Sequence, residues 1–156
     1  MIGETQNQEK FLPKVINRIK HNYLINVDTN EYGEIGTRKY VHVWDVANGV
    51  WIATRKLLEE FKDIENIAYP LKFHISGGQE ISNLELVTLV GDQLGIEPRI
   101  VISASPRPGY DLRYELSTDK IRELGWNESL PIRNRIAAIV KWTNEHPDWL
   151  YIDYPE

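Results

Sequence analysis

A segment near residue 110 combines cations and aromatic rings around a break in the backbone. Pro106 to Tyr114 contains two arginines, two tyrosines and an aspartate beside the pair Pro108-Gly109. Proline fixes its own backbone angle and glycine reaches angles closed to other residues, so we expect a shaped loop. The planar fork of arginine suits phosphate oxygens, and a tyrosine face suits a ring. The segment indicates an organic phosphate bearing a sugar or base; the alternative is a surface turn with solvated arginines.

The composition is that of one ordinary folded domain. The 156 residues are 42% hydrophobic and 26% charged, which predicts a single domain over residues 1–156. A net charge of −5 argues against a nucleic-acid partner, although it allows a local cationic pocket. Cysteine is absent, which excludes thiolate-metal sites and fits a cytoplasmic location. No apolar run reaches the ~20 residues that span a bilayer, so we expect no membrane partner.

Hydrophobic periodicity predicts short strands that alternate with helices. Helices are expected over residues 9–22, from Asp45 onward, from Ser82 to Leu94, over 118–124 and over 132–145. Strands are expected over 24–27, 38–43, 73–76 and 99–103. Ser82 and Glu85 form a capping box, and Asp45 is predicted to cap the second helix. The apolar face of that second helix is predicted to consist of Val46, Val50, Ala53, Leu57 and Leu58. The order is typical of an α/β domain with a thin sheet.

The motifs of cofactor binding and proton transfer are missing from this sequence. Gly77-Gly78 lacks the third glycine of a dinucleotide-binding turn, so a strand-to-helix turn is the better interpretation. The four histidines lack metal-ligand spacing, and we interpret His42 and His74 as structural. No Tyr-x-x-x-Lys pair is present. We therefore assign no catalytic, cofactor-binding or metal-ligating residue to the chain.

Four segments carry motifs of one family in the same order. They are Gly3-Glu4-Thr5-Gln6 with Glu9-Lys10-Phe11-Leu12-Pro13, Arg38-Lys39-Tyr40-Val41-His42-Val43-Trp44-Asp45-Val46-Ala47, Phe73-His74-Ile75-Ser76-Gly77 with Ser82-Asn83-Leu84-Glu85, and Arg107-Pro108-Gly109-Tyr110-Asp111-Leu112-Arg113-Tyr114. Together they resemble the carboxy-terminal part of extended short-chain dehydrogenase/reductases, the NAD-dependent nucleotide-sugar epimerases and dehydratases of the dTDP-glucose 4,6-dehydratase type. The resemblance implies a small mixed-sheet α/β substrate-binding domain that lacks the main Rossmann half.

The resemblance also implies roles for six residues. Arg38 and Arg107 would converge on the diphosphate of a nucleoside-diphosphate sugar. Residues 24–27 would lie where relatives hold the base. The other four candidates are Lys10 and Phe11 near the nucleotide, Tyr110 in place of the family's usual histidine, and Arg113, which either joins the site or pairs with Asp111 or a helix end.

Two functional hypotheses follow from this resemblance. In the first, the chain is a fragment that binds substrate for a lyase or epimerase and is inactive alone. NAD and the catalytic residues would then belong to an amino-terminal half encoded upstream. In the second, the chain is a non-catalytic protein-interaction module whose acidic loop, 28–34, contacts a partner. Apolar surface left by a missing half would favour homo-oligomers.

Overall fold

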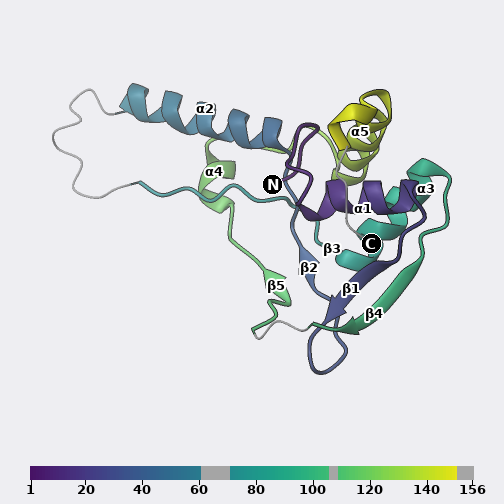
Figure 1. Ribbon diagram of the computed structural model, residues 1–156. Helices are drawn as coiled ribbons and strands as arrows, with labels where there is room; N and C mark the ends of the chain where they lie inside the picture. Colours follow the sequence, from purple (N-terminus) through teal and green to yellow (C-terminus); the bar gives the residue numbers. More distant parts are fainter. Residues whose placement is uncertain (61–70, 106–108, 151–156) are drawn as a thin grey trace.

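The computed structural model describes residues 1–60, 71–105 and 109–150. Its elements are α1 (Phe11–Lys20), β1 (Ile25–Thr29), β2 (Thr37–Arg38), α2 (Val43–Glu60), β3 (Ile81–Ser82), α3 (Asn83–Leu94), β4 (Ile100–Ala104), β5 (Arg113–Tyr114), α4 (Asp119–Glu123), α5 (Ile132–Glu145) and the 3-10 turn η2 (Pro147–Leu150). Figure 1 shows α1, α3 and α5 gathered near β1 and β4, whereas α2 projects away from them. The predicted α/β class is confirmed. Across the described residues, no helix is both long and apolar enough to cross a bilayer.

The strands form two small sheets. β1 and β4 pair in parallel, with Ile25 opposite Ile100. The second sheet has the order β3-β2-β5 and is mixed, because β2 is antiparallel to β3 and parallel to β5. These pairings bring the segment after β4 back beside β2, so residues 109–114 lie against residues 36–38 although more than 70 positions separate them in the sequence.

The core is divided between two clusters. The larger one joins α1, α3 and α5 to β1, and its fully buried members include Ile16, Val27, Leu86 and Ile136. The smaller one consists of Val41, Ile121 and Trp126, with residues of α2 and of segment 73–75 packed against it. The larger cluster holds α1 against β1, which sets the position of the candidate site described below.

Two predicted strands are corrected by the structure. The strand predicted over 38–43 is only two residues long, because the next residues pair with the amino terminus and then enter α2. Ile2 donates its N–H to the Val41 carbonyl at 2.9 Å and accepts from the Val43 N–H at 2.8 Å. Residues 73–76 form no strand, although Phe73 and Ile75 still pack on the smaller core cluster. The β-prone composition of both runs reflects burial against neighbours rather than a ladder.

The start of α2 also differs from the prediction. Asp45 lies inside the first turn of α2 and is not its cap. Its buried carboxylate accepts from the Ser129 N–H at 2.9 Å and approaches the Arg135 guanidinium. The predicted apolar face is wrong in part, because Val50 and Leu58 are exposed and the helix packs through Val46, Ile52 and Ala53. His42 is structural as predicted: it is buried and lies 3.0 Å from a Glu4 carboxylate oxygen.

The Ser82 half of the capping box predicted at α3 is confirmed, whereas the Glu85 carboxylate pairs with Arg133 of α5. The Ser82 hydroxyl accepts from the Glu85 N–H at 3.0 Å, and Gly95 ends the helix in the left-handed conformation with φ 66°. Asn83 is therefore the first residue of α3, and its N–H donates to the Gly36 carbonyl at 2.9 Å. This contact ties the start of α3 to the entry of β2, where Arg38 lies.

Gly77→Ala is expected to destabilise the protein by about 1–3 kcal/mol, since a Cβ here forces backbone segments apart. An added Cβ at Gly77 would lie 1.9 Å from the Tyr40 carbonyl oxygen. The matched control is Gly78→Ala, whose Cβ meets only the ends of the flexible Glu128 and Arg122 side chains, at 2.9 Å and 3.2 Å. Urea denaturation followed by tryptophan fluorescence measures both variants. Equal stability of the two would contradict the packing argument.

Candidate functional site

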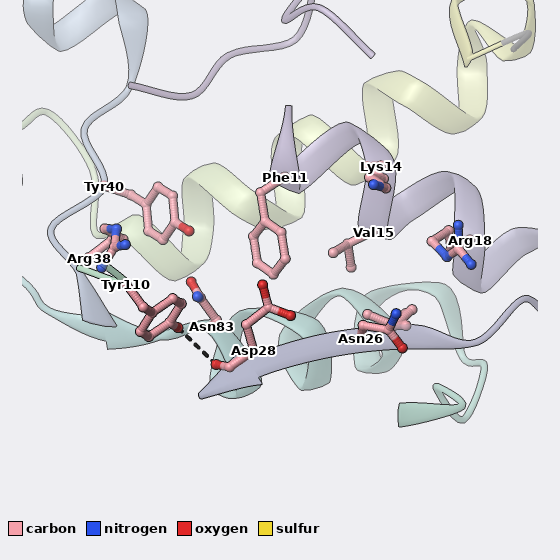
Figure 2. A pocket seen from close by; sticks show the side chains of 11 residues that line it. Phe11, Lys14, Val15, Arg18, Asn26, Asp28, Arg38, Tyr40, Asn83 and Tyr110 are labelled. Carbon is pink, nitrogen blue, oxygen red and sulfur yellow. Dashed lines mark hydrogen bonds between the residues drawn. The ribbon is translucent and has the colours of Figure 1, made fainter. Parts of the chain in front are cut away.

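A cavity of about 430 Å³ lies between α1 and β1 and extends to β2. Figure 2 shows its lining side chains converging from separate parts of the chain. The lining residues are Phe11, Lys14, Val15 and Arg18 of α1, Ile25, Asn26 and Asp28 of β1, Arg38 and Tyr40 at β2, Asn83 of α3, and Tyr110. Two smaller cavities, one between α3 and α5 and one at the amino terminus, have fewer charged and aromatic side chains in their linings.

One face of α1 forms a wall of the cavity. Phe11, Lys14, Val15 and Arg18 are spaced by three and four residues, which puts them on one side of a helix. Lys14 is exposed, whereas Arg18 is held by a bond from its Nε to the Leu24 carbonyl at 2.6 Å. The wall therefore offers a ring at one end and two cations further along.

The guanidinium of Arg38 is fixed at the opposite side of the cavity. It donates to the carbonyls of Thr37 at 2.6 Å, Asp111 at 2.9 Å and Leu112 at 3.2 Å. Its Cζ also lies 4.6 Å from the centre of the Tyr114 ring. Arg38 thus joins β2 to the chain segment before β5 and presents a preorganised cation to the cavity.

Two tyrosines complete this side. The Tyr110 hydroxyl donates to the Asp28 carbonyl at 2.8 Å and accepts from the Gly36 N–H at 3.0 Å, so it connects the end of β1 to the entry of β2 (Figure 2). Burial raises the pKa of Tyr40 to about 12, although the nearby Arg38 cation opposes this. The Tyr40 hydroxyl is therefore protonated at neutral pH and can donate a hydrogen bond into the cavity.

The charges of the lining favour an anionic ligand that carries rings. Lys14, Arg18 and Arg38 supply three cations, and Asp28 supplies one carboxylate. Phe11, Tyr40 and Tyr110 offer aromatic surface beside them. Over residues 1–60, 71–105 and 109–150, no three His, Asp or Glu side chains gather closely enough to hold a metal ion. Because three cations face one carboxylate in the lining, the cavity can neutralise phosphate oxygens.

The structure brings together three of the six candidate residues. Phe11, Arg38 and Tyr110 line the cavity. Lys10 is exposed at the start of α1, and Arg113 forms ion pairs with Glu80 and Glu115, so neither lines it. Arg107 lies outside the described residues, so the predicted convergence of Arg38 and Arg107 stays a prediction. Residues 25 and 26, within the segment expected near a base, do line the cavity.

Sequence reasoning missed several lining residues. Lys14 and Arg18 are not among the six candidates, although their spacing from Phe11 places all three on one face of α1. Asn83 is the first residue of α3, and it also lines the cavity. No sequence motif marks Asp28 or Tyr40 as lining residues. They reach the cavity only because β1 and β2 pair with segments far away in the sequence.

Solved structures define the class to which this fold belongs. The UDP-glucuronic acid 4-epimerase of Bacillus cereus, in complex with UDP-glucuronic acid and NAD, matches with a TM-score of 0.75 at 16% identity, over 93% of this chain and 43% of that one. A likeness at this identity shows the fold alone, which this chain shares with about two fifths of that epimerase.

Two closer relatives specify the family. DesIV, a dTDP-glucose 4,6-dehydratase from Streptomyces venezuelae with NAD bound, matches with a TM-score of 0.72 at 28% identity, over 95% of this chain and 42% of that one. The dTDP-glucose 4,6-dehydratase of an Actinoplanes species is 30% identical over 149 residues, which are 94% of this chain. This chain is thus a homologue of the carboxy-terminal part of NAD-dependent nucleotide-sugar dehydratases, as the motifs predicted. It spans about two fifths of the length of the curated relatives it matches. No family model matches the chain.

Proposed function

We propose that the cavity binds the nucleoside-diphosphate part of a nucleotide sugar. The observation that carries this proposal is the lining itself, in which Lys14, Arg18 and Arg38 lie beside the rings of Phe11, Tyr40 and Tyr110. Each cation–phosphate hydrogen bond contributes roughly 1.5–3 kcal/mol. A cavity of about 430 Å³ falls within the range of small-molecule sites.

The orientation of the ligand follows from the distribution of the lining groups. Arg38 and the Tyr40 hydroxyl lie together at β2 and suit the diphosphate oxygens. Phe11 of α1 lies between that end and Lys14 (Figure 2). The base then rests along α1 beside Ile25 and Asn26, and Arg107 adds a second guanidinium at the diphosphate, as the resemblance implies.

Within a complete enzyme, this chain would position the sugar and supply none of the reacting groups. NAD and the acid-base residues belong to an amino-terminal Rossmann half in this proposal. Holding a substrate in a reactive orientation accounts for several kcal/mol of barrier lowering in enzymes generally. We expect the chain by itself to bind but not to convert a nucleotide sugar, the parent reaction being dehydration or epimerisation.

The test is calorimetric titration of the full chain with dTDP-glucose and UDP-glucose. Arg107→Ala is expected to weaken binding by about 10- to 100-fold, since it removes one cation from the diphosphate, and Lys14→Ala is expected to weaken binding less, because Lys14 lies beyond Phe11 at the base end. Arg133→Ala is the matched control, because Arg133 lies on α5, pairs with Glu85 and does not line the cavity. Arg38→Lys keeps the charge but loses the planar fork, and is expected to bind more weakly than the parent chain.

Two results would contradict the proposal. One is equal affinity for glucose and for the nucleotide sugars, because then the cations contribute nothing. The other is the lack of any binding at millimolar ligand, both for the chain alone and with an amino-terminal half of a relative added. The second result would favour the protein-interaction module.

A further inference from the structure

Most contacts of the Arg38 guanidinium come from one short segment, residues 111–114. The carbonyls of Asp111 and Leu112 accept from it at 2.9 and 3.2 Å, and the centre of the Tyr114 ring lies 4.6 Å from its Cζ. A further carbonyl, at 2.6 Å, is that of the preceding residue. The orientation of Arg38 in the cavity (Figure 2) therefore depends on where residues 111–114 are held.

The backbone of this segment is held by a very short ladder. β5 lies at an edge of the β3-β2-β5 sheet and pairs with β2 over only two residues, the first of which is Arg113 opposite Thr37. Strands in folded proteins usually contain about five or six residues. Both residues of β5 are also exposed, so no core packing fixes them. Side-chain interactions are therefore needed to keep β5 in its place beside β2.

A network of charged side chains supplies such interactions. Arg113 donates through Nε and Nη2 to both carboxylate oxygens of Glu80, at 2.8 and 2.9 Å, which is the bidentate geometry of a strong pair. Glu80 immediately precedes β3 and also accepts from the Thr37 hydroxyl of β2 at 2.5 Å. Glu115 then joins Arg113 to Lys39 through two ion pairs, each of 2.8 Å. The network thus connects all three strands of the sheet.

The alternation of side chains along the strands separates this network from the cavity. Successive residues of a strand point to opposite faces, so Arg38 lies on the face opposite Thr37, and Tyr114 lies on the face opposite Arg113. The contact between Arg38 and the Tyr114 ring agrees with this arrangement, and so do the bonds of Thr37 and Arg113 to the same carboxylate. One face of the sheet therefore ties the strands together, and the other carries Arg38, which lines the cavity.

We propose that Arg113 is a positioning residue of the nucleotide-sugar site: its bidentate pair with Glu80 holds residues 111–114, and through them the Arg38 guanidinium, in the orientation that meets a phosphate. This role rests on the proposed function, and Arg113 acts without lining the cavity itself. The Arg113 side chain is 54% exposed, and ion pairs at such positions contribute little to the free energy of unfolding. Loss of the pair is therefore expected to affect the affinity for the ligand more than the stability of the fold.

Calorimetric titration of the full chain with dTDP-glucose, combined with urea denaturation, tests this role. Arg113→Gln is expected to weaken binding by about 3- to 10-fold, the cost of ordering one long side chain on binding, with an unchanged urea midpoint. Glu80→Gln is expected to act alike, and the double variant is expected to bind no more weakly than either single one, since the two side chains act as one unit. Arg113→Lys keeps the charge without the fork and is expected to retain part of the lost affinity. The matched control is Arg133→Gln, which breaks an ion pair at 51% exposure on α5 and should change neither measurement.

Nuclear magnetic resonance of the arginine side chains gives a second readout that needs no ligand. In the parent chain, the Nη protons of Arg38 are expected to give resolved signals, because their bonds to carbonyls slow the rotation of the guanidinium; loss of these signals in Arg38→Lys assigns them. Arg113→Gln is expected to broaden them, and Arg133→Gln to leave them unchanged.

Three results would overturn the positioning role of Arg113. They are Arg38 signals that persist in Arg113→Gln, an unchanged affinity of that variant, and a loss of affinity that is matched by a fall in the urea midpoint. A parent chain that binds no nucleotide sugar would instead contradict the proposed function, and the Arg38 signals would still show whether Arg113 orients that guanidinium.

Discussion

Trp126→Ala is expected to lower the free energy of unfolding by about 3–5 kcal/mol, because it removes the largest side chain of the smaller core cluster. Trp126 is fully buried, and its Nε1 donates to the Asp45 carbonyl at 2.8 Å. The Arg122 guanidinium stacks on its ring, 5.2 Å from the ring centre. Loss of this side chain therefore frees α2 and α4 together. Urea denaturation measures the total loss, and hydrogen exchange locates it.

The control for this prediction is Trp126→Phe. It keeps an aromatic ring in the cluster but leaves the Asp45 carbonyl without its donor, so we expect a smaller loss, of about 1–3 kcal/mol. Exchange protection in the Trp126→Ala variant is expected to fall first in α2 and to persist in α3, which belongs to the other cluster. Uniform loss of protection across α2 and α3 would show that the two clusters unfold as one unit.

Asp45→Ala is expected to destabilise the protein by about 3–5 kcal/mol, the cost of breaking a buried ion pair on one side only. The Asp45 carboxylate accepts from the Ser129 N–H and hydroxyl and lies 3.4 Å from Arg135 Nη2. Removing it leaves the Arg135 guanidinium, only 13% exposed, without its counter-charge. Asp45→Asn retains part of the hydrogen bonding and is expected to cost less. Thermal and urea denaturation measure both variants.

The same carboxylate predicts a pH dependence. Burial alone would raise the pKa of Asp45, but the Ser129 hydrogen bonds and the Arg135 charge outweigh it and hold that pKa below its usual value of 3.8. The ionised group therefore stabilises the fold above the unfolded pKa, and this contribution disappears as the pH falls through the lower folded pKa. Below about pH 4, the parent chain should lose stability more steeply than Asp45→Asn. Parallel slopes for the two proteins would contradict the assignment.

Local signals predicted the helices well. The capping box of Ser82 and Glu85 placed the start of α3, and the helix predicted over 132–145 has the bounds of α5. These signals operate within a few residues, since a cap bonds to the first turn it precedes. The predictions failed where distant segments compete for the backbone. Residues 41–43 bond to Ile2 instead of extending β2, and residues 73–76 contribute side chains to a core without joining a sheet.

The sequence by itself determined the α/β class, the family resemblance and three lining residues, Phe11, Arg38 and Tyr110, because motifs record the types of residue that a ligand needs. Only the tertiary structure decided which cations share the cavity. Lys14 and Arg18 face it because the larger core cluster fixes the rotation of α1 against β1. The same holds for α2: its sequence is apolar on two sides, and packing on Trp126 decided which side is buried and which remains exposed. Hydrophobic periodicity identifies the apolar faces of a helix. Which of these faces becomes buried depends on contacts between residues far apart in the chain.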